Sequence, residues 1–169
     1  GYRTTQMYTA ITFEFRRPDG DVMVNGLPGR LGQVLRNLID NALTFSPEKP
    51  DASVRLSFEQ QTQDDTKTVV IHVDDDGPGI PQDDLDMIFK RFYTQRPKGA
   101  AFGDHSGLGL AICRQIMDAH GGTIVASNRT DDQGAEHGEA HGVSQGARFT
   151  ITLPLQSTIK ERGRDKKHK

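Results

Sequence analysis

The sequence predicts a two-layer α/β (α+β) sandwich, in which a mixed, mostly antiparallel sheet of about five strands is covered on one face by three main helices. Two observations predict this fold. Short segments of strand-forming residues occur in pairs around polar turns. Segments with apolar residues at helical spacing lie between and after these pairs, bounded by Pro or Gly. A chain of 169 residues suits one such domain with a single core.

The first two predicted strands form a hairpin at the entry to the domain. Residues 9–15 and 22–25 contain strand-forming side chains, and the turn residues Pro18-Asp19-Gly20 lie between them. We therefore expect these two strands to pair with each other.

An amphipathic helix is predicted over residues 28–45. Its apolar residues recur at the i, i+3, i+4, i+7 spacing of one helix face: Leu31, Val34, Leu35, Leu38, Ile39 and Ala42. Asn37 and Asn41 are four positions apart, so they share a neighbouring face of this helix.

A second hairpin is predicted from residues 53–60 and 67–74, with the polar residues 61–66 as its turn. The apolar residues of its second strand alternate toward a core. The acidic glycine turn of residues 76–79 follows at once, so Asp76 emerges at the end of a strand.

Pro81 begins a predicted short helix that reaches Phe92. Proline tolerates the first helical position, and Asp83 and Asp84 favour the positive end of the helix dipole. We expect Phe89 and Phe92 to share one face and to act as hydrophobic anchors.

The last predicted helix covers residues 108–120 and ends at Gly121-Gly122. Strands over residues 123–128 and 147–153 complete the sheet, and the polar, glycine-rich residues 129–146 connect them. The sequence shows no internal repeat.

Composition narrows the class of partner. The net charge of −2 and the pI near 6.3 argue against the clustered basic surface of a nucleic-acid-binding protein. No apolar run approaches the ~20 residues that cross a bilayer, so we expect no direct membrane contact from this chain. Cys113, the single cysteine, excludes a disulfide within the chain and is expected to be a small buried hydrophobe.

Three polar motifs follow one another in an order that suits a nucleotide pocket. The helical pair Asn37 and Asn41 comes first, the acidic glycine turn at Asp76 second, and the glycine loop of residues 106–110 last. Each motif alone is common in unrelated folds, but the ordered set is far more specific. No GxxxxGK[ST] segment occurs, so the glycine loop is not a Walker loop.

The ordered set resembles the catalytic, ATP-binding domain of bacterial sensor histidine kinases, the HATPase_c domain of the GHKL superfamily, with its Bergerat fold. The resemblance is carried by an N box over residues 30–45, a G1 box over 76–80, an F box over 89–92 and a G2 box over 106–110.

The resemblance also implies an organisation for the whole chain. Residues 9–155 are the ATP-binding catalytic domain, with an ATP lid over 94–106 and a polar hairpin loop over 129–146. Residues 1–8 follow a dimerisation domain that lies outside the chain. Residues 156–169 form a basic tail that we expect to be disordered and solvated.

The resemblance assigns roles within the pocket. It implies that Asn41 is the direct Mg²⁺ ligand, supported by Asn37 one helical turn earlier. It implies that Asp76 accepts a hydrogen bond from the exocyclic amine of adenine, which guanine replaces by an oxygen. The implied nucleotide-binding residues are Asn37, Asn41, Phe45, Asp76, Gly77, Gly79, Ile80, Tyr93, Arg96, Ser106, Gly107, Leu108, Gly109 and Leu110.

The glycines of these motifs have a physical reason. Gly77 and Gly79 let the backbone turn sharply and approach the base closely. Gly107 and Gly109 lie where a loop becomes a helix, so free amide groups and the positive helix end can face the phosphates. Phe45 is expected to pack against the base or the ribose, or else to belong to the core.

Three positions depart from the family pattern. Thr44 and Thr94 stand where the family often has Lys or Arg, and His105 replaces the usual first glycine of the G2 box. Arg91, Arg96 and Lys98 are candidate replacements for the missing positive charge.

The implied function is that of a protein-histidine kinase, which holds Mg²⁺ and ATP and presents the γ-phosphate to a histidine on another domain. No catalytic residue is assigned within the chain, because no His here has the His-Glu-x-x-x-Pro context of the phosphoacceptor.

The lid sequence and the G2 box resemble the alphaproteobacterial ChvG/ExoS/BvrS group of envelope-sensing kinases. This implies a cytoplasmic domain of an inner-membrane sensor that is a homodimer when complete and passes phosphate to an OmpR-family response regulator. We expect the fragment itself to be a monomer.

Two other functions stay open. One is an ATP-hydrolysing machine of the gyrase, Hsp90 and MutL kind, which uses a Glu where this chain has Asn37. The other is a nucleotide-binding regulatory module without transfer activity. His137, Glu139 and His141 have a loose metal-like spacing, but they lie in a polar loop and are not assigned as ligands.

Overall fold

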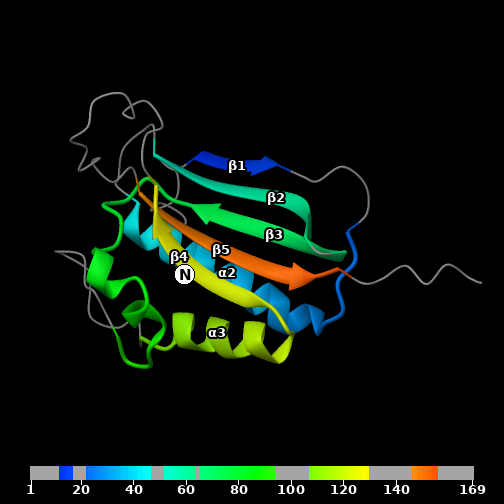
Figure 1. The fold of residues 1–169 in the computed structure, drawn as a ribbon. Helices are drawn as coiled ribbons and strands as arrows, with labels where there is room; N and C mark the ends of the chain where they lie inside the picture. The colour runs from blue at the N-terminus through cyan, green and yellow to red at the C-terminus, as the bar shows by residue number, and fades with distance from the viewer. Residues whose placement is uncertain are drawn as a thin grey trace, which may run out of the picture.

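The computed structural model describes residues 12–16, 22–46, 52–63, 65–93, 107–129 and 146–155. These residues form two layers: a sheet, and two helices that cover one of its faces (Figure 1). This arrangement confirms the predicted α/β sandwich.

Within the described residues the sheet has five strands, in the order β1-β2-β3-β5-β4. The strands are β1 (Thr12–Arg16), β2 (Ser53–Gln63), β3 (Thr66–Asp74), β4 (Thr123–Asn128) and β5 (Ala147–Pro154). The four strands from β2 to β4 pair in antiparallel fashion, whereas β1 joins the edge of β2 in parallel. The sheet is thus mixed and mostly antiparallel, as predicted.

The predicted hairpin of residues 9–15 and 22–25 is wrong. β1 pairs with β2, in a register that runs from Thr12 opposite Ser53 to Arg16 opposite Ser57. Val24 instead forms a single bridge with Leu155, at the end of β5. Local turn residues predicted a local partner, but the five-residue ladder with β2 and the packing of Val24 against the core decide the pairing.

The second hairpin is confirmed, with longer strands than predicted. β2 and β3 pair from Arg55 opposite Asp74 to Gln63 opposite Thr66, so most of the predicted turn belongs to the strands. The polar side chains there are exposed, and the ladder rather than burial keeps them extended. Asp65, at the turn, has a φ of 61°, which Asp tolerates better than most residues.

The long helix α2 (Pro28–Phe45) begins and ends at the predicted residues, and α3 (Gly109–Ala119) lies within the predicted 108–120. The predicted helix after Pro81 takes the form of two successive 3₁₀ turns, Gln82–Asp84 and Met87–Phe89.

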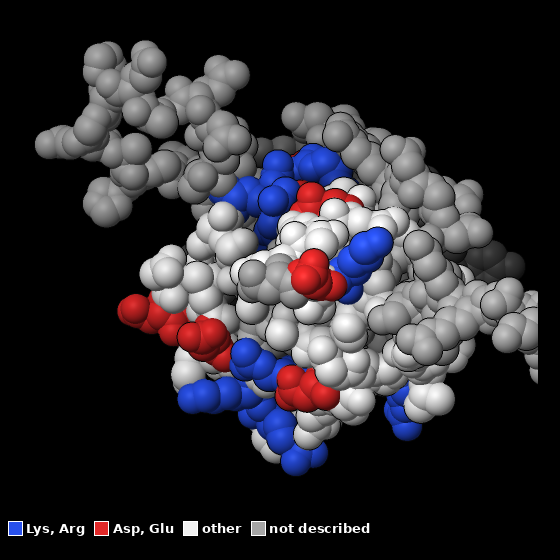
Figure 2. Space-filling view, turned by 45° about the vertical axis from the view of Figure 1, so that its right-hand side comes forward, with Lys and Arg blue, Asp and Glu red and all other residues white. Residues whose placement is uncertain are grey.

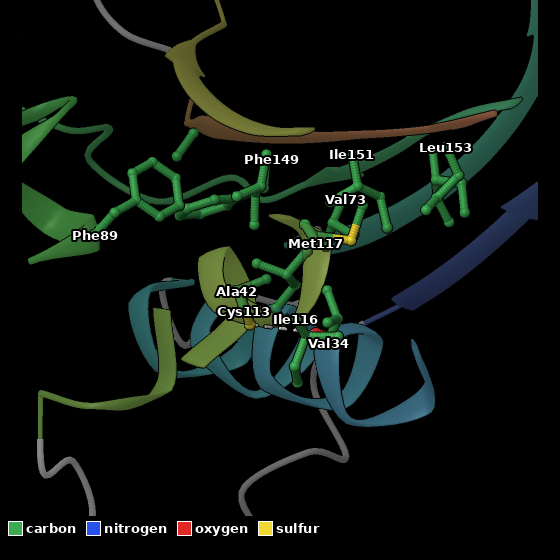
Figure 3. Packing of buried hydrophobic residues seen from close by; sticks show 14 of the residues in the cluster. Val34, Ala42, Val73, Phe89, Cys113, Ile116, Met117, Phe149, Ile151 and Leu153 are labelled. Carbon is green, nitrogen blue, oxygen red and sulfur yellow. Dashed lines mark hydrogen bonds between the residues drawn. The ribbon is translucent and has the colours of Figure 1, made fainter. Parts of the chain in front are cut away.

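The core lies between the helices and the sheet (Figure 3). Val34, Leu38 and Ala42 of α2 are fully buried, and so is Cys113 of α3. Phe89 packs edge-on against Phe149 of β5, with ring centroids 6.4 Å apart. Burial raises the pKa of the Cys113 thiol to about 11, so this cysteine acts as a small core residue.

Phe92 does not share a face with Phe89, so that prediction is wrong. Phe89 is 5% exposed, whereas Phe92 is 74% exposed and has a φ of +65°. The chain leaves the second 3₁₀ turn at Lys90 in an extended conformation, which breaks the helical spacing between the two rings.

The surface charge is mixed on the face drawn in Figure 2, where acidic and basic side chains lie close to one another. Among the described residues, no helix is both long and apolar enough to cross a membrane.

Candidate functional site

The helix α2 contacts the start of α3 through Asn37. The Asn37 side-chain amide donates a hydrogen bond to the carbonyl oxygen of Gly109 at 3.3 Å. A Cβ atom on Gly109 would lie 3.9 Å from the Asn37 side chain, an ordinary van der Waals distance, so the two residues are direct neighbours. The asparagine helix and the glycine loop are therefore neighbours, although 72 residues separate them.

The other end of α2 contacts the acidic glycine turn. A Cβ atom on Gly77 would stand 2.6 Å from the carbonyl oxygen of Phe45, the last residue of the helix. Only glycine allows this contact. The structure thus brings all three predicted motifs together around α2.

Asp75 lies at the bottom of the acidic turn. It is 2% exposed, and its Oδ1 accepts hydrogen bonds from the backbone N–H of Gly77 at 2.8 Å and of Ala147 at 3.0 Å. No described residue donates a hydrogen bond to its Oδ2. One carboxylate oxygen is therefore fixed, and the other remains able to accept from a ligand.

Burial raises the pKa of Asp75 above its ordinary value. The two backbone hydrogen bonds act in the opposite sense, the charge of Asp76 raises the pKa further, and the charge of Arg129 lowers it. Asp75 is thus a buried acid in a cluster of charges, a combination that is common at functional sites.

Asp76 makes contacts of a different kind. Its Oδ1 forms ion pairs with Arg55 and with Arg129, the latter at 3.0 Å. Its Oδ2 accepts from the backbone N–H and the hydroxyl of Ser53, both at 2.9 Å, and from Arg55. These five contacts use the acceptor capacity of a carboxylate.

These contacts hold the pKa of Asp76 at about 2. Burial raises this pKa, but the hydrogen bonds from Arg55, Ser53 and Arg129 together lower it by more. An acceptor already saturated by protein donors is poorly suited to a purine. Asp75 thus has a carboxylate oxygen without a donor among the described residues, whereas both oxygens of Asp76 have protein donors.

The sequence-based prediction did not consider Asp75. The alternation of side chains along a strand distinguishes it from the aspartates on either side. Side chains on a strand point to alternate faces, so Asp75 continues the series Val69, Ile71, Val73 toward the helix-covered face. Asp74 points to the other face, where Arg148 binds it through two hydrogen bonds of 2.7 Å. Counting by two from Val69, Ile71 and Val73 reaches Asp75 and not Asp76.

Ile80 ends the acidic turn and is held by Asn128, the last residue of β4. Asn128 Oδ1 accepts from the Ile80 N–H at 2.7 Å, and Asn128 Nδ2 donates to the Ile80 carbonyl oxygen at 2.6 Å. Sequence reasoning missed Asn128, because nothing in its neighbourhood marks it as different from an ordinary strand end.

The start of α3 presents backbone donors. No side chain caps α3 at Leu108, so the backbone N–H groups of residues 109–111 receive no side-chain acceptor from a cap. Gly107 has a φ of +66°, and its carbonyl oxygen accepts from the Phe92 N–H at 2.9 Å. Leu108 and Leu110 are half-buried beside these groups. This geometry suits an anion such as a phosphate.

Asn41 lies one turn after Asn37 on α2 and is half-buried. It has no hydrogen bond to another described residue, so its amide oxygen is available to a cation. The described residues contain no group of three or more His, Cys, Asp or Glu side chains able to hold a metal ion. A magnesium ion would fit here only when it is shared with phosphates, which is its usual mode of binding. The Thr44 hydroxyl donates to the Asp40 carbonyl oxygen at 2.8 Å, within the helix itself.

Several predicted residues cannot be placed in the site. Arg96 and Ser106 lie outside the described residues, as do Thr94 and His105 and most of the 129–146 loop with its two histidines. Tyr93 is half-buried and packs against the core at the edge of the described segment.

Residues 26–157 match one protein family over most of the chain: the histidine kinase-, DNA gyrase B-, and HSP90-like ATPases. The chain belongs to this family. The match includes all three motifs that converge on α2.

Among the relatives of this ATPase-family chain is the sensor protein ChvG of Agrobacterium fabrum, which is 45% identical over 80% of the chain. ChvG of Rhizobium meliloti is 43% identical over 81%. The chain spans about a fifth of the length of these relatives, 21% and 22% respectively. Its place among sensor proteins of the ChvG group agrees with the resemblance seen in the lid and the G2 box.

Solved structures of histidine kinases share the fold. The mycobacterial sensor histidine kinase MprB superposes with a TM-score of 0.67 and 29% identity, over 91% of this chain and 88% of MprB. Histidine kinase ThkA, in its complex with the response regulator protein TrrA, superposes with a TM-score of 0.62 and 28% identity, over 91% of this chain and 36% of ThkA.

Proposed function

We propose that this domain binds ATP together with Mg²⁺ and presents the γ-phosphate to a histidine on the dimerisation domain of the same kinase. The observation that carries the proposal is the convergence of the three motifs on α2, through Asn37 with Gly109 and through Phe45 with Gly77. Side chains for a metal and a purine and backbone amide groups for a polyphosphate then surround one region.

Each element of the site has a distinct part. Asp75 Oδ2 accepts a hydrogen bond from the exocyclic amine of adenine, and Phe45 packs beside the base. The Asn41 oxygen is the protein's ligand to Mg²⁺, which neutralises phosphate charge when bound. The amide groups at the start of α3 face the phosphates. Tyr93, Arg96 and Ser106 also bind the nucleotide in this proposal, and the last two belong to the predicted lid of residues 94–106, which lies outside the described residues.

Phosphoryl transfer asks mainly for position and charge neutralisation. The acceptor imidazole nitrogen forms a bond to the γ-phosphorus as the bond from phosphorus to the bridging oxygen breaks, and ADP leaves. The chain's own residues hold the nucleotide in line and supply no covalent intermediate.

The relatives support a larger setting for this domain. ThkA is bound to a response regulator in its complex, and we propose an OmpR-family response regulator as the onward phosphate acceptor here. We also propose that the complete protein is a membrane-anchored homodimeric sensor, with this domain on the cytoplasmic side.

Calorimetric titration with a non-hydrolysable ATP analogue tests nucleotide binding. We expect micromolar to sub-millimolar affinity that is lost on chelation of Mg²⁺ or in Asn41→Ala. Asp75→Asn should abolish selectivity for ATP over GTP, whereas Asp76→Asn should lower stability more than selectivity. The reverse pattern would return the adenine role to Asp76.

A transfer assay separates the kinase from an ATP-hydrolysing machine, the second function that the family includes. The position that carries a water-activating Glu in such machines is Asn37, whose amide nitrogen donates to Gly109 and which cannot act as a base. Labelled phosphate should therefore appear on a separately purified phosphoacceptor domain. Its release into water at a comparable rate would favour hydrolysis.

A further inference from the structure

Two residues at the end of β4, Asn128 and the following Arg129, form hydrogen bonds with the acidic turn. The nucleotide roles above do not explain these contacts. The first is Asn128, whose side-chain amide pairs with both backbone groups of Ile80, at 2.7 and 2.6 Å. This two-way pairing has the pattern of a strand ladder, made by a side chain. It fixes the position of the last residue of the turn.

The second is Arg129, which contacts each of three consecutive aspartates. Its Nη1 donates to the backbone carbonyl oxygen of Asp75 at 2.9 Å and to Asp76 Oδ1 at 3.0 Å. Its Nε lies 3.8 Å from Asp74 Oδ2. The backbone N–H of Arg129 donates to the Gly146 carbonyl oxygen at 2.9 Å, so the arginine is itself anchored between β4 and β5.

Together these contacts fix both ends of the turn from Asp75 to Ile80. Asp75 Oδ1 is held by Gly77 and Ala147, and the Asp75 carbonyl oxygen is held by Arg129. With the backbone and one carboxylate oxygen fixed, the direction of Oδ2 is determined. Rigid supporting contacts of this kind decide how well a binding group discriminates between ligands.

We propose that Asn128 and Arg129 are positioning residues that determine the selectivity of this site for adenine over guanine. The inference depends on the proposed function, because it assigns these residues to the same purine site. A well-placed carboxylate accepts from the adenine amine and repels the guanine oxygen, and a misplaced one does neither well.

Charge supports the same conclusion. Asp74 and Asp76 flank Asp75 and form ion pairs with three arginines: Arg129, which follows β4, Arg55 of β2 and Arg148 of β5. Arg129 alone among these arginines touches Asp75. Its removal would leave the Asp75 carboxylate beside Asp76 with less compensation, which disfavours the ionised acceptor.

The test compares two arginines of the same cluster. Affinities of ATP and GTP analogues, both with Mg²⁺, are measured by calorimetry for the wild type, Arg129→Gln, Arg129→Lys, Asn128→Ala and Arg148→Gln. Arg148→Gln is the matched control, because Arg148 binds Asp74 but neither Asp75 nor Asp76. Circular dichroism confirms that each variant is folded at the temperature used.

We expect Arg129→Gln and Asn128→Ala to reduce the ratio of ATP to GTP affinity by about tenfold, the scale of one lost charged or buried hydrogen bond. Arg129→Lys should restore part of the ratio, because it keeps the charge near Asp75. Arg148→Gln should lower the melting temperature and leave the ratio unchanged.

Two results would overturn the proposal. In one, Arg129→Gln lowers the melting temperature while the ratio stays at the wild-type value, which makes the arginine merely structural. In the other, Arg148→Gln changes the ratio as much as Arg129→Gln does. A wild-type chain that binds no ATP would instead refute the proposed function, so the two failures are distinct.

Discussion

Gly77 lies so close to the end of α2 that a Cβ atom on it would stand 2.6 Å from the Phe45 carbonyl oxygen and 2.9 Å from Asp75 Oδ1. Both distances are shorter than a real Cβ contact allows. The turn that carries Asp75 therefore packs against the helix that carries the two asparagines only because residue 77 has no Cβ atom.

Gly77→Ala should separate this turn from the helix. The shorter contact is with the Phe45 backbone, which cannot rotate away, so we expect a loss of about 1 to 3 kcal/mol in the free energy of unfolding and weaker ATP binding. Urea denaturation and calorimetry measure the two effects.

Gly29→Ala is the matched control for Gly77→Ala. Gly29 lies in α2, and nothing stands within 4 Å of its added Cβ. This change should be neutral or stabilise the protein by up to about 1 kcal/mol, because alanine favours a helix. Equal behaviour of the two variants would mean that the Phe45 contact does not shape the site.

The two phenylalanines of the F box should differ in their contribution to stability. Phe89 is 5% exposed and packs on Phe149, and the Arg114 guanidinium lies 4.7 Å from the centre of the Phe89 ring. Phe89→Ala should cost roughly 3 to 5 kcal/mol. Phe92 is exposed, so Phe92→Ala should change the free energy of unfolding by less than about 0.5 kcal/mol.

Phe92→Gly gives a sharper test of the same assignment. Phe92 has a φ of +65°, which glycine adopts without the steric cost of a side chain. We expect this variant to be at least as stable as Phe92→Ala by thermal denaturation. A large loss of stability in either Phe92 variant would show that its ring is buried in solution.

Local periodicity predicted the elements whose partners are close in sequence. The helix of residues 28–45 was correct to the residue because Pro28 begins it and its apolar stripe faces the core. The hairpin of β2 and β3 was correct because a short polar turn joins its strands. The pairing of β1 with β2 was missed because it joins residues about 40 positions apart, and no local signal encodes such a partner.

The site was predicted at the level of motifs and less well at the level of single side chains. Asn37 and the acidic turn do meet around α2, but the sequence did not show that protein donors bind both oxygens of Asp76 and only one oxygen of Asp75. Asn128 and Arg129 were not predicted, because their importance comes from contacts across 48 to 54 residues of sequence. Such contacts appear only when the sheet is assembled.

Acid should destabilise the wild type through Asp76. Its pKa is about 2 in the folded protein against 3.8 ordinarily, so the ionised Asp76 adds to the free energy of unfolding above pH 3.8. This contribution is lost as the pH falls toward 2. The shift corresponds to at most about 2.5 kcal/mol. The raised pKa of Asp75 acts in the opposite sense, because its protonation favours the native state.

Comparison of the wild type with Asp76→Asn tests this effect, together with the part of the Asp75 shift that the Asp76 charge causes. The difference in their free energies of unfolding should be largest near neutral pH and should shrink between about pH 4 and pH 2. Urea titrations at a series of pH values measure it. A difference that is constant with pH would mean that the charge of Asp76 does not stabilise the fold.

Ser46→Ala should stabilise the protein. Ser46 follows the last residue of α2, is 8% exposed, and its Oγ has no hydrogen-bond partner in the described part of the chain. A buried hydroxyl without a partner loses its hydration and gains nothing in return, at a cost of about 1 to 3 kcal/mol. The backbone N–H of Ser46 donates to the Ala42 carbonyl oxygen and is unaffected by the change. Thermal denaturation should therefore show a higher melting temperature for the variant.

Ser53→Ala is the matched control for Ser46→Ala, because Ser53 is equally buried but its hydroxyl donates to Asp76 Oδ2 at 2.9 Å. This variant should lose about 1 to 2 kcal/mol.

The same measurements repeated with Mg²⁺ and an ATP analogue then test whether the Ser46 hydroxyl has a partner in the bound state. Ser46 lies directly after Phe45, so a hydroxyl that binds the nucleotide would make Ser46→Ala more stable alone and weaker in ATP affinity. If Ser46→Ala melts at a lower temperature without nucleotide, the Ser46 hydroxyl is satisfied within the folded chain.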